Sequence, residues 1–482
     1  QGSQIRLGGA SSTLNLGENA VLSVSDTSGD AYIKGMLYTS GALVNLTGSM
    51  GTGNSITIMP AAGAAVGTQI LSGLTTDILA SYGYFHLAPD STQAQNNLAI
   101  GADGKLFMNV TADQFTADSW SELKSVIEGL VPGSAAEVTI TGGLTANSTI
   151  SVPVGVAVTV TDDDKGYAIA RNMPAFKGNI FSVTSGGTLI LDGTLTIDGN
   201  STDASKADEA LIHNYGALTI GHGTTIQGAI KNGANNGIGV GTGKSGGAIE
   251  SKGALEIKGT ITTSNSGNGT AVAALGGTLI VDDANLSGNT GRALRIDLST
   301  ATITDATLNN NTANGGGAVL IDAATVTVKD STISGNTSPG TGGAFQTTAA
   351  TSKLTLENCT VSKNIAATKG GGVQVGGNGA TVDVMGGIFE ENSVSTSGTN
   401  YGGGAINLGG GVSTKLTIQG AKFVGNTSKL NGGAIHIEVA VSSLSITGGT
   451  FSANQADSHG GAIHFVKATT ATITDSTFSN NI

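Results

Sequence analysis

Apolar and polar residues alternate in short segments through most of the chain. Examples are Leu416-Thr417-Ile418, Ile435-His436-Ile437 and Leu444-Ser445-Ile446, and their shared period of two is that of a β-strand. Glycine, asparagine, aspartate, serine and threonine, the residues of tight turns, stand between these segments. The pattern therefore predicts an all-β chain built from many short strands.

The second half of the chain repeats two motifs in phase. One is Gly-Gly-Ala-apolar or a near variant, and the other is an apolar residue followed three positions later by asparagine. The first motif begins at Gly246, Gly291, Gly316, Gly342, Gly370, Gly403, Gly432 and Gly460. From Asn289 to Asn481 the chain runs 481 − 289 = 192 residues in seven intervals, about 27 residues per repeat. Such a period predicts stacked repeats, none of which buries a core by itself.

Three short strands and their turns fit into one such repeat, which describes one coil of a parallel β-solenoid. Successive coils stack about 4.8 Å apart, so like residues lie above like. We expect the recurring apolar position to form a core stack. The asparagine should lie in a turn and bond backbone amides and the asparagines of neighbouring coils. The aromatic copies of these positions are Phe389, Phe423, Phe451 and Phe478, with Asn392, Asn426, Asn454 and Asn481.

One segment predicts a helix. Ser119 and Glu122 have the spacing of a capping box. The apolar face that follows is made of Trp120, Leu123, Ile127 and Leu130. We expect this helix, near residues 119–130, to cover the open end of the solenoid that begins after it.

The helix divides the chain into three predicted regions. Residues 1–112 are a β-rich module without the in-phase motifs, interpreted as the closing coils of an earlier β-solenoid. Residues 113–133 are the capping helix and its linker. Residues 134–482 are the main parallel β-helix, with regular coils from about residue 246.

The residue after each Gly-Gly-Ala-apolar element should point outward and form a second column. Its members are Glu250, Arg295, Leu320, Gln346, Gln374, Asn407, His436 and His464. The two histidines are expected about 4.8 Å apart on an exposed sheet. Three interpretations stay open: an ordinary solvated polar face, a transition-metal site if a carboxylate joins the histidines, or a pH-dependent surface.

In order and phase, the Gly-Gly-Ala and Phe-x-x-Asn motifs resemble those of the chlamydial polymorphic membrane proteins and of other β-helical bacterial surface proteins. The resemblance covers about residues 246–482. It implies a right-handed parallel β-helix that is exported to the bacterial cell surface or secreted. It also implies an adhesive function, similar to that of autotransporter passengers.

Composition agrees with an exported surface protein, with 76 glycines and only 12% charged residues. The net charge, 22 − 34 = −12, argues against nucleic acid and anionic membrane surfaces as partners. No stretch approaches the roughly 18 apolar residues of a membrane-spanning helix. Cys359, the single cysteine, lies two residues before the core position Val361, so we expect it to face inward as a small apolar filler, with an intermolecular disulfide as the alternative.

Polysaccharide lyases and glycosidases also use the β-helix, and this sequence carries fragments that resemble their signatures. Gly221-His222-Gly223 resembles one element of the polygalacturonase signature. That signature also has an Asp-Asp pair before this element and Arg-Ile-Lys after it. Here the pair Asp282-Asp283 comes after the element, and Arg295-Ile296-Asp297 stands in place of Arg-Ile-Lys. Asp162-Asp163-Asp164-Lys165 is interpreted as a solvated loop, with weak cation binding as the alternative. Gly243-Lys244-Ser245 copies only the end of a P-loop. We assign no catalytic residue, cofactor or metal ligand.

Two functions of different classes follow. The first is a non-catalytic cell-surface or secreted module, a rigid rod that binds a host or bacterial surface protein or glycan, or its own copies. The second is a polysaccharide-binding or polysaccharide-cleaving β-helix, which carboxylates and aromatics gathered on one exposed face would favour. Aromatic residues are only 4% of the chain, so the first function leads. We interpret the chain as a processed product or fragment whose last coil continues into further repeats or stacks end-on.

Overall fold

The computed structural model describes eight strands within residues 13–110, together with residues 112–200, 209–229, 246–263, 269–438, 443–467 and 471–482. The chain forms two compact units. The first comprises residues 1–114, 130–137 and 155–157, and the second comprises residues 115–129, 138–154 and 158–482.

The first unit contains two small sheets. One has the order β1-β3-β5-β8-β7 and the other β2-β4-β6. The pairs β1/β3, β3/β5, β2/β4 and β4/β6 are parallel, whereas β8 pairs antiparallel with both β5 and β7. The strands are β1 (Thr13–Leu16), β2 (Asp30–Lys34), β3 (Leu43–Leu46), β4 (Ser55–Met59), β5 (Gln69–Ser72), β6 (Phe85–Leu87), β7 (Asn96–Ile100) and β8 (Leu106–Val110).

The predicted helix is α2 (Trp120–Gly129). At its start the Glu122 N–H donates to Ser119 Oγ at 3.4 Å, and the Asp118 N–H donates to Glu122 Oε2 at 3.0 Å, which satisfies two otherwise unpaired amides. Its residues Trp120, Leu123 and Ile127 are buried against the strands of the first coil, and the Trp120 ring also lies 5.9 Å from the ring of Phe181 in the second coil. The helix therefore covers apolar side chains of the first coil, as its sequence predicts.

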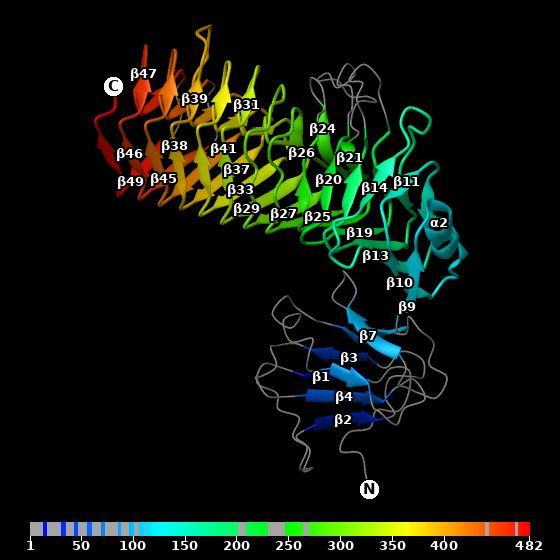
Figure 1. The fold of residues 1–482 in the computed structure, drawn as a ribbon. Helices are drawn as coiled ribbons and strands as arrows, with labels where there is room; N and C mark the ends of the chain where they lie inside the picture. The colour runs from blue at the N-terminus through cyan, green and yellow to red at the C-terminus, as the bar shows by residue number, and fades with distance from the viewer. Residues whose placement is uncertain are drawn as a thin grey trace. The chain divides into compact units, whose positions relative to one another are not determined.

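The β-helix is organised around one long parallel sheet (Figure 1). Within the described residues this sheet has 14 strands, and the side chains of its inner strands alternate between buried and outward positions. The strands are β9 (Asp113–Ala117), β10 (Ala135–Ile140), β13 (Ala157–Thr161), β16 (Thr188–Leu191), β19 (Ala217–Ile220), β22 (Ala254–Ile257), β25 (Thr278–Asp282), β27 (Thr300–Thr304), β29 (Thr325–Lys329), β33 (Lys353–Glu357), β37 (Thr381–Met385), β41 (Lys415–Gln419), β45 (Ser443–Thr447) and β49 (Ala471–Thr474).

A second parallel sheet includes, from β21 onward, the strands at the Gly-Gly-Ala motifs. We call it the 12-stranded sheet, counting the strands that the structure describes. The strands are β12 (Ile150–Val152), β15 (Phe181–Val183), β18 (Ile212–Asn214), β21 (Gly246–Ser251), β24 (Thr270–Leu275), β26 (Arg292–Asp297), β28 (Val319–Asp322), β32 (Phe345–Thr347), β36 (Val373–Val375), β40 (Ile406–Leu408), β44 (Ile435–Ile437) and β48 (Ile463–Phe465).

The remaining sides of the coils differ between the early and late repeats. Early coils have one further strand each: β11 (Leu144–Ala146), β14 (Ala168–Arg171), β17 (Thr196–Asp198), β20 (Thr225–Gln227) and β23 (Thr260–Ile261). Late coils carry the Phe position on β30 (Thr332–Ser334), β34 (Thr360–Ser362), β38 (Ile388–Glu390), β42 (Lys422–Val424), β46 (Thr450–Ser452) and β50 (Thr477–Ser479).

Late coils also have a fourth, two-residue strand after the asparagine turn: β31 (Thr337–Ser338), β35 (Ile365–Ala366), β39 (Ser393–Val394), β43 (Thr427–Ser428) and β47 (Gln455–Ala456). The prediction of three strands per coil is therefore right for the early coils, whereas the described late coils have up to four. The two coils between them, with β24/β25 and β26/β27, have two strands each and single-residue bridges at Asn285 and Thr307. Strands this short are too brief to show a periodic pattern in the sequence.

The core of the late coils contains a phenylalanine stack. Neighbouring rings of Phe389, Phe423, Phe451 and Phe478 have centroids 4.9, 4.8 and 4.8 Å apart and are nearly parallel. The first three side chains are 0–1% exposed, and Phe478, on the terminal strand of its sheet, is 45% exposed. The strand register thus sets the ring spacing directly.

The asparagines form a buried ladder beside this stack. Asn392 Nδ2 donates to Asn426 Oδ1 at 3.0 Å, and Asn426 Nδ2 donates to Asn454 Oδ1 at 2.9 Å and to the Phe389 carbonyl at 2.9 Å. Each Oδ1 also accepts the backbone N–H of the preceding asparagine, as Asn454 Oδ1 does from Asn426. The buried amides are thereby paired with backbone and with each other, which ties consecutive turns together.

Candidate functional site

The clearest polar constellation of the β-helix lies on the outward side of the 12-stranded sheet. Gln374, Asn407, His436 and His464 occupy equivalent positions on β36, β40, β44 and β48 and pair in register. Their neighbours along the strands, such as Ile406 and Leu408, fill the core. The column predicted from the motif spacing therefore exists.

The prediction that this column is exposed to solvent is wrong. Gln374 is 5% exposed, Asn407 and His436 are fully buried, and His464 is partly buried. Isolated β-bridges join Lys369, Gly402, Asn431 and His459 of successive coils in that order. This ladder of bridged residues packs against the column. At Gly402 a Cβ atom would lie 2.9 Å from the His436 ring, so the glycine allows the backbone to cover the histidine. Alternation along a strand says which face a side chain takes, but not what covers that face.

Two residues that the sequence did not single out complete the constellation. Glu438 follows β44, and its Oε1 accepts from Asn407 Nδ2 at 2.6 Å, while its Oε2 accepts from Lys369 Nζ at 2.7 Å. Lys369 and Glu438 are 69 residues apart in sequence. The only sequence signal is position: Lys369 immediately precedes Gly370-Gly371, and Glu438 immediately follows the strand that carries His436.

Glycine also makes room for the carboxylate. A Cβ atom at Gly409 would lie 2.9 Å from Glu438 Oε1 and 3.3 Å from Gln374 Nε2. A side chain at this position would therefore displace the carboxylate or the amide from its partner. The side chains are 25% exposed for Lys369 and 9% for Glu438, so the pair is largely withdrawn from water.

The hydrogen bonds define the proton position on His436. Asn407 Nδ2 donates both to Gln374 Oε1 at 2.8 Å and to Glu438 Oε1. Asn407 Oδ1 is then an acceptor, and His436 Nδ1, 2.9 Å away, is its N–H donor. His436 Nε2 is left as a buried acceptor without a hydrogen-bond partner. Burial, together with nearby His464 and Lys369, lowers the pKa of His436 to about 4.

Three imidazoles stack at this end of the column. The His436 and His464 rings lie 5.3 Å apart, and the His464 and His459 rings lie 5.5 Å apart. Burial and His459 lower the pKa of His464. Nitrogen lone pairs lie in the ring planes, so stacked rings aim them side by side instead of toward one shared ion. Over the described residues, no group of three or more His, Cys, Asp or Glu side chains could hold a metal ion.

The earlier part of the same column is charged. Arg295 Nε donates to both oxygens of Asp297 at 3.1 Å, and its Nη2 lies 3.9 Å from Asp322. Leu320 and Gln346 follow Arg295 in register. Glu250, paired in register with His213, lies further toward the N-terminus. The structure thus separates this guanidinium–carboxylate group from the Lys369–Glu438 constellation instead of joining them in one cluster.

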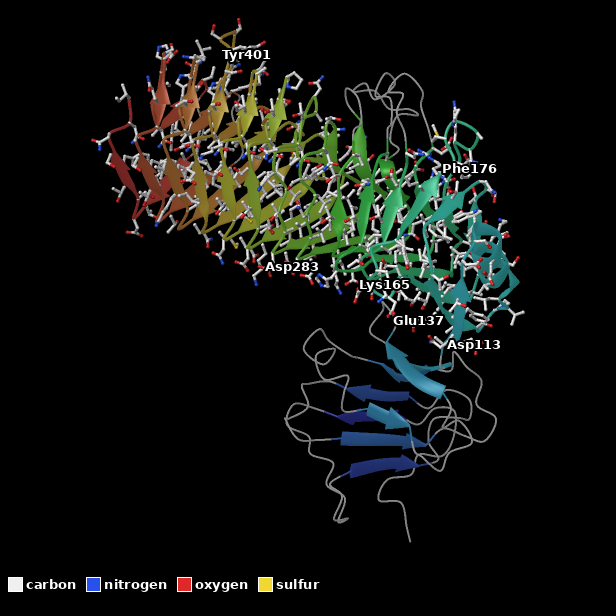
Figure 2. All side chains as sticks on the ribbon, viewed as in Figure 1. Asp113, Glu137, Lys165, Phe176, Asp283 and Tyr401 are labelled. Carbon is white, nitrogen blue, oxygen red and sulfur yellow. The ribbon has the colours of Figure 1, made fainter. Side chains whose placement is uncertain are left out.

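The remaining sequence candidates lie apart from these groups. His222 is exposed in a turn, and Asp283 and Lys165 point outward at the edge of the coils (Figure 2). Asp162 corrects our prediction of a fully solvated acidic loop, because it is buried and accepts the Tyr167 N–H at 2.9 Å and the Thr194 N–H at 3.0 Å. Gly243-Lys244-Ser245 lies outside the described residues.

Cys359 faces the interior. It is 2% exposed, and its Sγ lies 3.3 Å from the Val328 carbonyl. Burial raises the pKa of its thiol to about 11, so the reactive thiolate is disfavoured at neutral pH. The cysteine therefore packs as a small apolar side chain.

Comparison with known proteins identifies the architecture. Residues 192–361 match the family model described as a right handed beta helix region. No curated protein matches the chain. Together with the stacked parallel sheets, the match defines a right-handed parallel β-helix, and the residues that the structure describes include one short helix. Among the described helices, none has the length and apolar character needed to cross a membrane.

Proposed function

We propose that this chain is a non-catalytic, adhesive module of a bacterial cell surface or secreted protein. Its partner would be a host or bacterial surface protein or glycan, or another copy of the chain. The Gly-Gly-Ala and Phe-x-x-Asn motifs, similar to the passenger repeats of chlamydial polymorphic membrane proteins, support this location and this class of function.

The observation that carries the proposal is the regular outer face of the 14-stranded sheet. Thr300 pairs in register with Thr325, and Thr302 with Thr327 and then Thr355. These side chains are exposed or partly exposed while the alternate positions fill the core. A rigid array of hydroxyl groups at the strand spacing of about 4.8 Å can donate and accept several hydrogen bonds at once without ordering a flexible loop.

A binding experiment with the full chain tests the proposal. The purified chain is passed over immobilised neutral and acidic polysaccharides, surface-protein fractions and intact bacterial or host cells. We expect saturable retention on at least one of these surfaces, and a Thr302→Glu/Thr327→Glu variant should lose most of it. Thr360→Glu on β34, outside this sheet, is the matched control and should bind like the unmodified chain.

The same samples distinguish the enzymatic alternative. The chain is incubated with each polysaccharide, with and without Ca²⁺, and new reducing ends and unsaturated products are followed. Sustained turnover above background would replace the proposal with a polysaccharide-cleaving function. Folded chain that is retained on none of the surfaces would also overturn it.

A further inference from the structure

The two carboxylate oxygens of Glu438 each accept a hydrogen bond, one from the amine of Lys369 and one from the side-chain amide of Asn407. Lys369 Nζ donates to Oε2 at 2.7 Å, and Asn407 Nδ2 donates to Oε1 at 2.6 Å. Asn407 is fully buried and Glu438 is 9% exposed. A carboxylate within hydrogen-bond reach of both groups can take a proton from one nitrogen and deliver it to the other.

We propose that Lys369, Asn407 and Glu438 form an intramolecular isopeptide bond, joining Lys369 Nζ to Asn407 Cγ with loss of ammonia. Glu438 first takes a proton from the Lys369 ammonium, which leaves a neutral amine and a neutral carboxylic acid. The amine attacks Asn407 Cγ, and Glu438 relays one proton from the attacking nitrogen to the amide nitrogen. The bond between Cγ and the amide nitrogen then breaks, and this nitrogen leaves as ammonia. Ammonia finally takes up the proton first held by Glu438, so the reaction needs no oxidant, reductant or co-reactant.

His436 is placed to assist this step. Its Nδ1 lies 2.9 Å from Asn407 Oδ1 and donates to it, and this oxygen is the atom on which negative charge develops when the amine attacks Cγ. Gln374 Oε1 accepts from the same amide nitrogen at 2.8 Å and holds the amide plane in place. Glu438 therefore holds the nucleophile and the amide on its two oxygens, and His436 supplies the oxyanion donor, before the reaction begins. Such preorganisation lowers a reaction barrier.

The bond would connect consecutive coils. Lys369 is bridged to Gly402 in the ladder that covers the column, and Asn407 lies on β40, five residues after Gly402. The other described members of this ladder, Thr341, Gly402, Asn431 and His459, carry no amine, so this constellation occurs once along the bridged positions. A covalent link here would close residues 369–407 into a loop and resist separation of these two coils under load.

Mass spectrometry of the full chain tests the inference directly. Under denaturing conditions we expect an intact mass lower than the sequence mass by one ammonia. Cyclisation of an amino-terminal glutamine or succinimide formation at an asparagine removes the same mass. Peptide mapping must therefore recover one branched peptide joining Lys369 to Asn407. An intact mass without this loss, or a link at any other amide, overturns the proposal.

Substitutions assign the roles. Lys369→Met and Asn407→Ala should abolish the branched peptide, and Glu438→Gln should slow its formation by about 100-fold or more, the scale of general acid–base catalysis. His436→Gln should also slow it. Glu391→Gln, in the exposed Lys363–Glu391 pair, is the matched control and should cross-link normally. Normal linking by folded Glu438→Gln would overturn the carboxylate's role. The mass readout is independent of the binding assay, so either proposal can fail alone.

Discussion

At the residue scale, alternation correctly identified side chains that face the core. Phe423 and Phe451, expected in the core stack, are fully buried, and their rings lie 4.8 Å apart. The same alternation placed His436 on the outward side of its strand, but it could not show that the ladder through Gly402 covers it. Glu438 and Lys369 were missed because partners 69 residues apart meet only after the coils stack.

Replacing a phenylalanine of the stack by alanine should reduce the free energy of unfolding more when the ring is more deeply buried. Phe451→Ala removes a fully buried ring between two stacked neighbours, so we expect a loss of about 3–5 kcal/mol in the free energy of unfolding of these coils. Phe478→Ala, at a ring that is 45% exposed, should cost clearly less. Denaturant titration of both variants gives the comparison, and equal losses would contradict the assignment of the stack to the core.

Burial of His436 also predicts a pH dependence. Its pKa is about 4 in the folded chain and about 6.5 when unfolded, so the unfolded chain takes up the proton first as the pH falls. The stabilisation is fully present above about pH 6.5 and is lost as the pH decreases toward 4. Urea midpoints measured from pH 7 to pH 4 should therefore fall more steeply for the unmodified chain than for His436→Gln.

The matched control for this experiment is His222→Gln, because His222 is exposed in a turn. It should keep the slope of the unmodified chain. The groups facing His436 are His464 and Lys369, which oppose its protonation, His459 across the stack, and Glu438, which already pairs with Lys369. If His436→Gln and the unmodified chain shared one slope, His436 would not be the group that titrates.

At the scale of the element, the repeat predicted the positions of the longer strands. It was less successful in predicting the number of strands in each coil. The alternating segments predicted strands such as β41, β44 and β45, which lie in the 14-stranded and 12-stranded sheets. The two-residue strands such as β43 were not predicted, since they owe their pairing to the coils above and below. The helix was predicted from local signals alone: the capping-box spacing of Ser119 and Glu122, and one apolar face.

The asparagine ladder makes its own prediction. Asn426→Ala would leave the backbone N–H and Nδ2 of Asn392 without their acceptor and the Phe389 carbonyl without its donor. Each buried polar group left unpaired costs about 1–3 kcal/mol. We therefore expect faster hydrogen exchange in β38, β42 and β46, measured by mass spectrometry. Thr447→Ala, at an exposed position of the 14-stranded sheet, should leave exchange unchanged. Unchanged protection in Asn426→Ala would contradict the role of the ladder.

At the scale of the whole molecule, the β-helix was predictable because each coil repeats the contacts of the one before it. Stability in such a stack is close to a sum of coil and neighbour terms, so damage should stay near its source. Ile303→Asp places an unpaired charge at a fully buried position of β27. Hydrogen exchange should accelerate in β25, β27 and β29 and stay slow in β13 and β45. Equal acceleration throughout would mean that the coils unfold as one cooperative unit.

The asparagine ladder also aligns side-chain dipoles along the axis of the β-helix. From Asn289 onward each Nδ2 donates to the Oδ1 of the next coil, so the side-chain amide dipoles align and add. The partial negative end lies at Asn289 Oδ1, where the Thr263 N–H and hydroxyl donate at 2.7 and 3.0 Å. The partial positive end lies toward Asn481. The column therefore acts as a weak dipole along the stacking axis, comparable in kind to that of an α-helix.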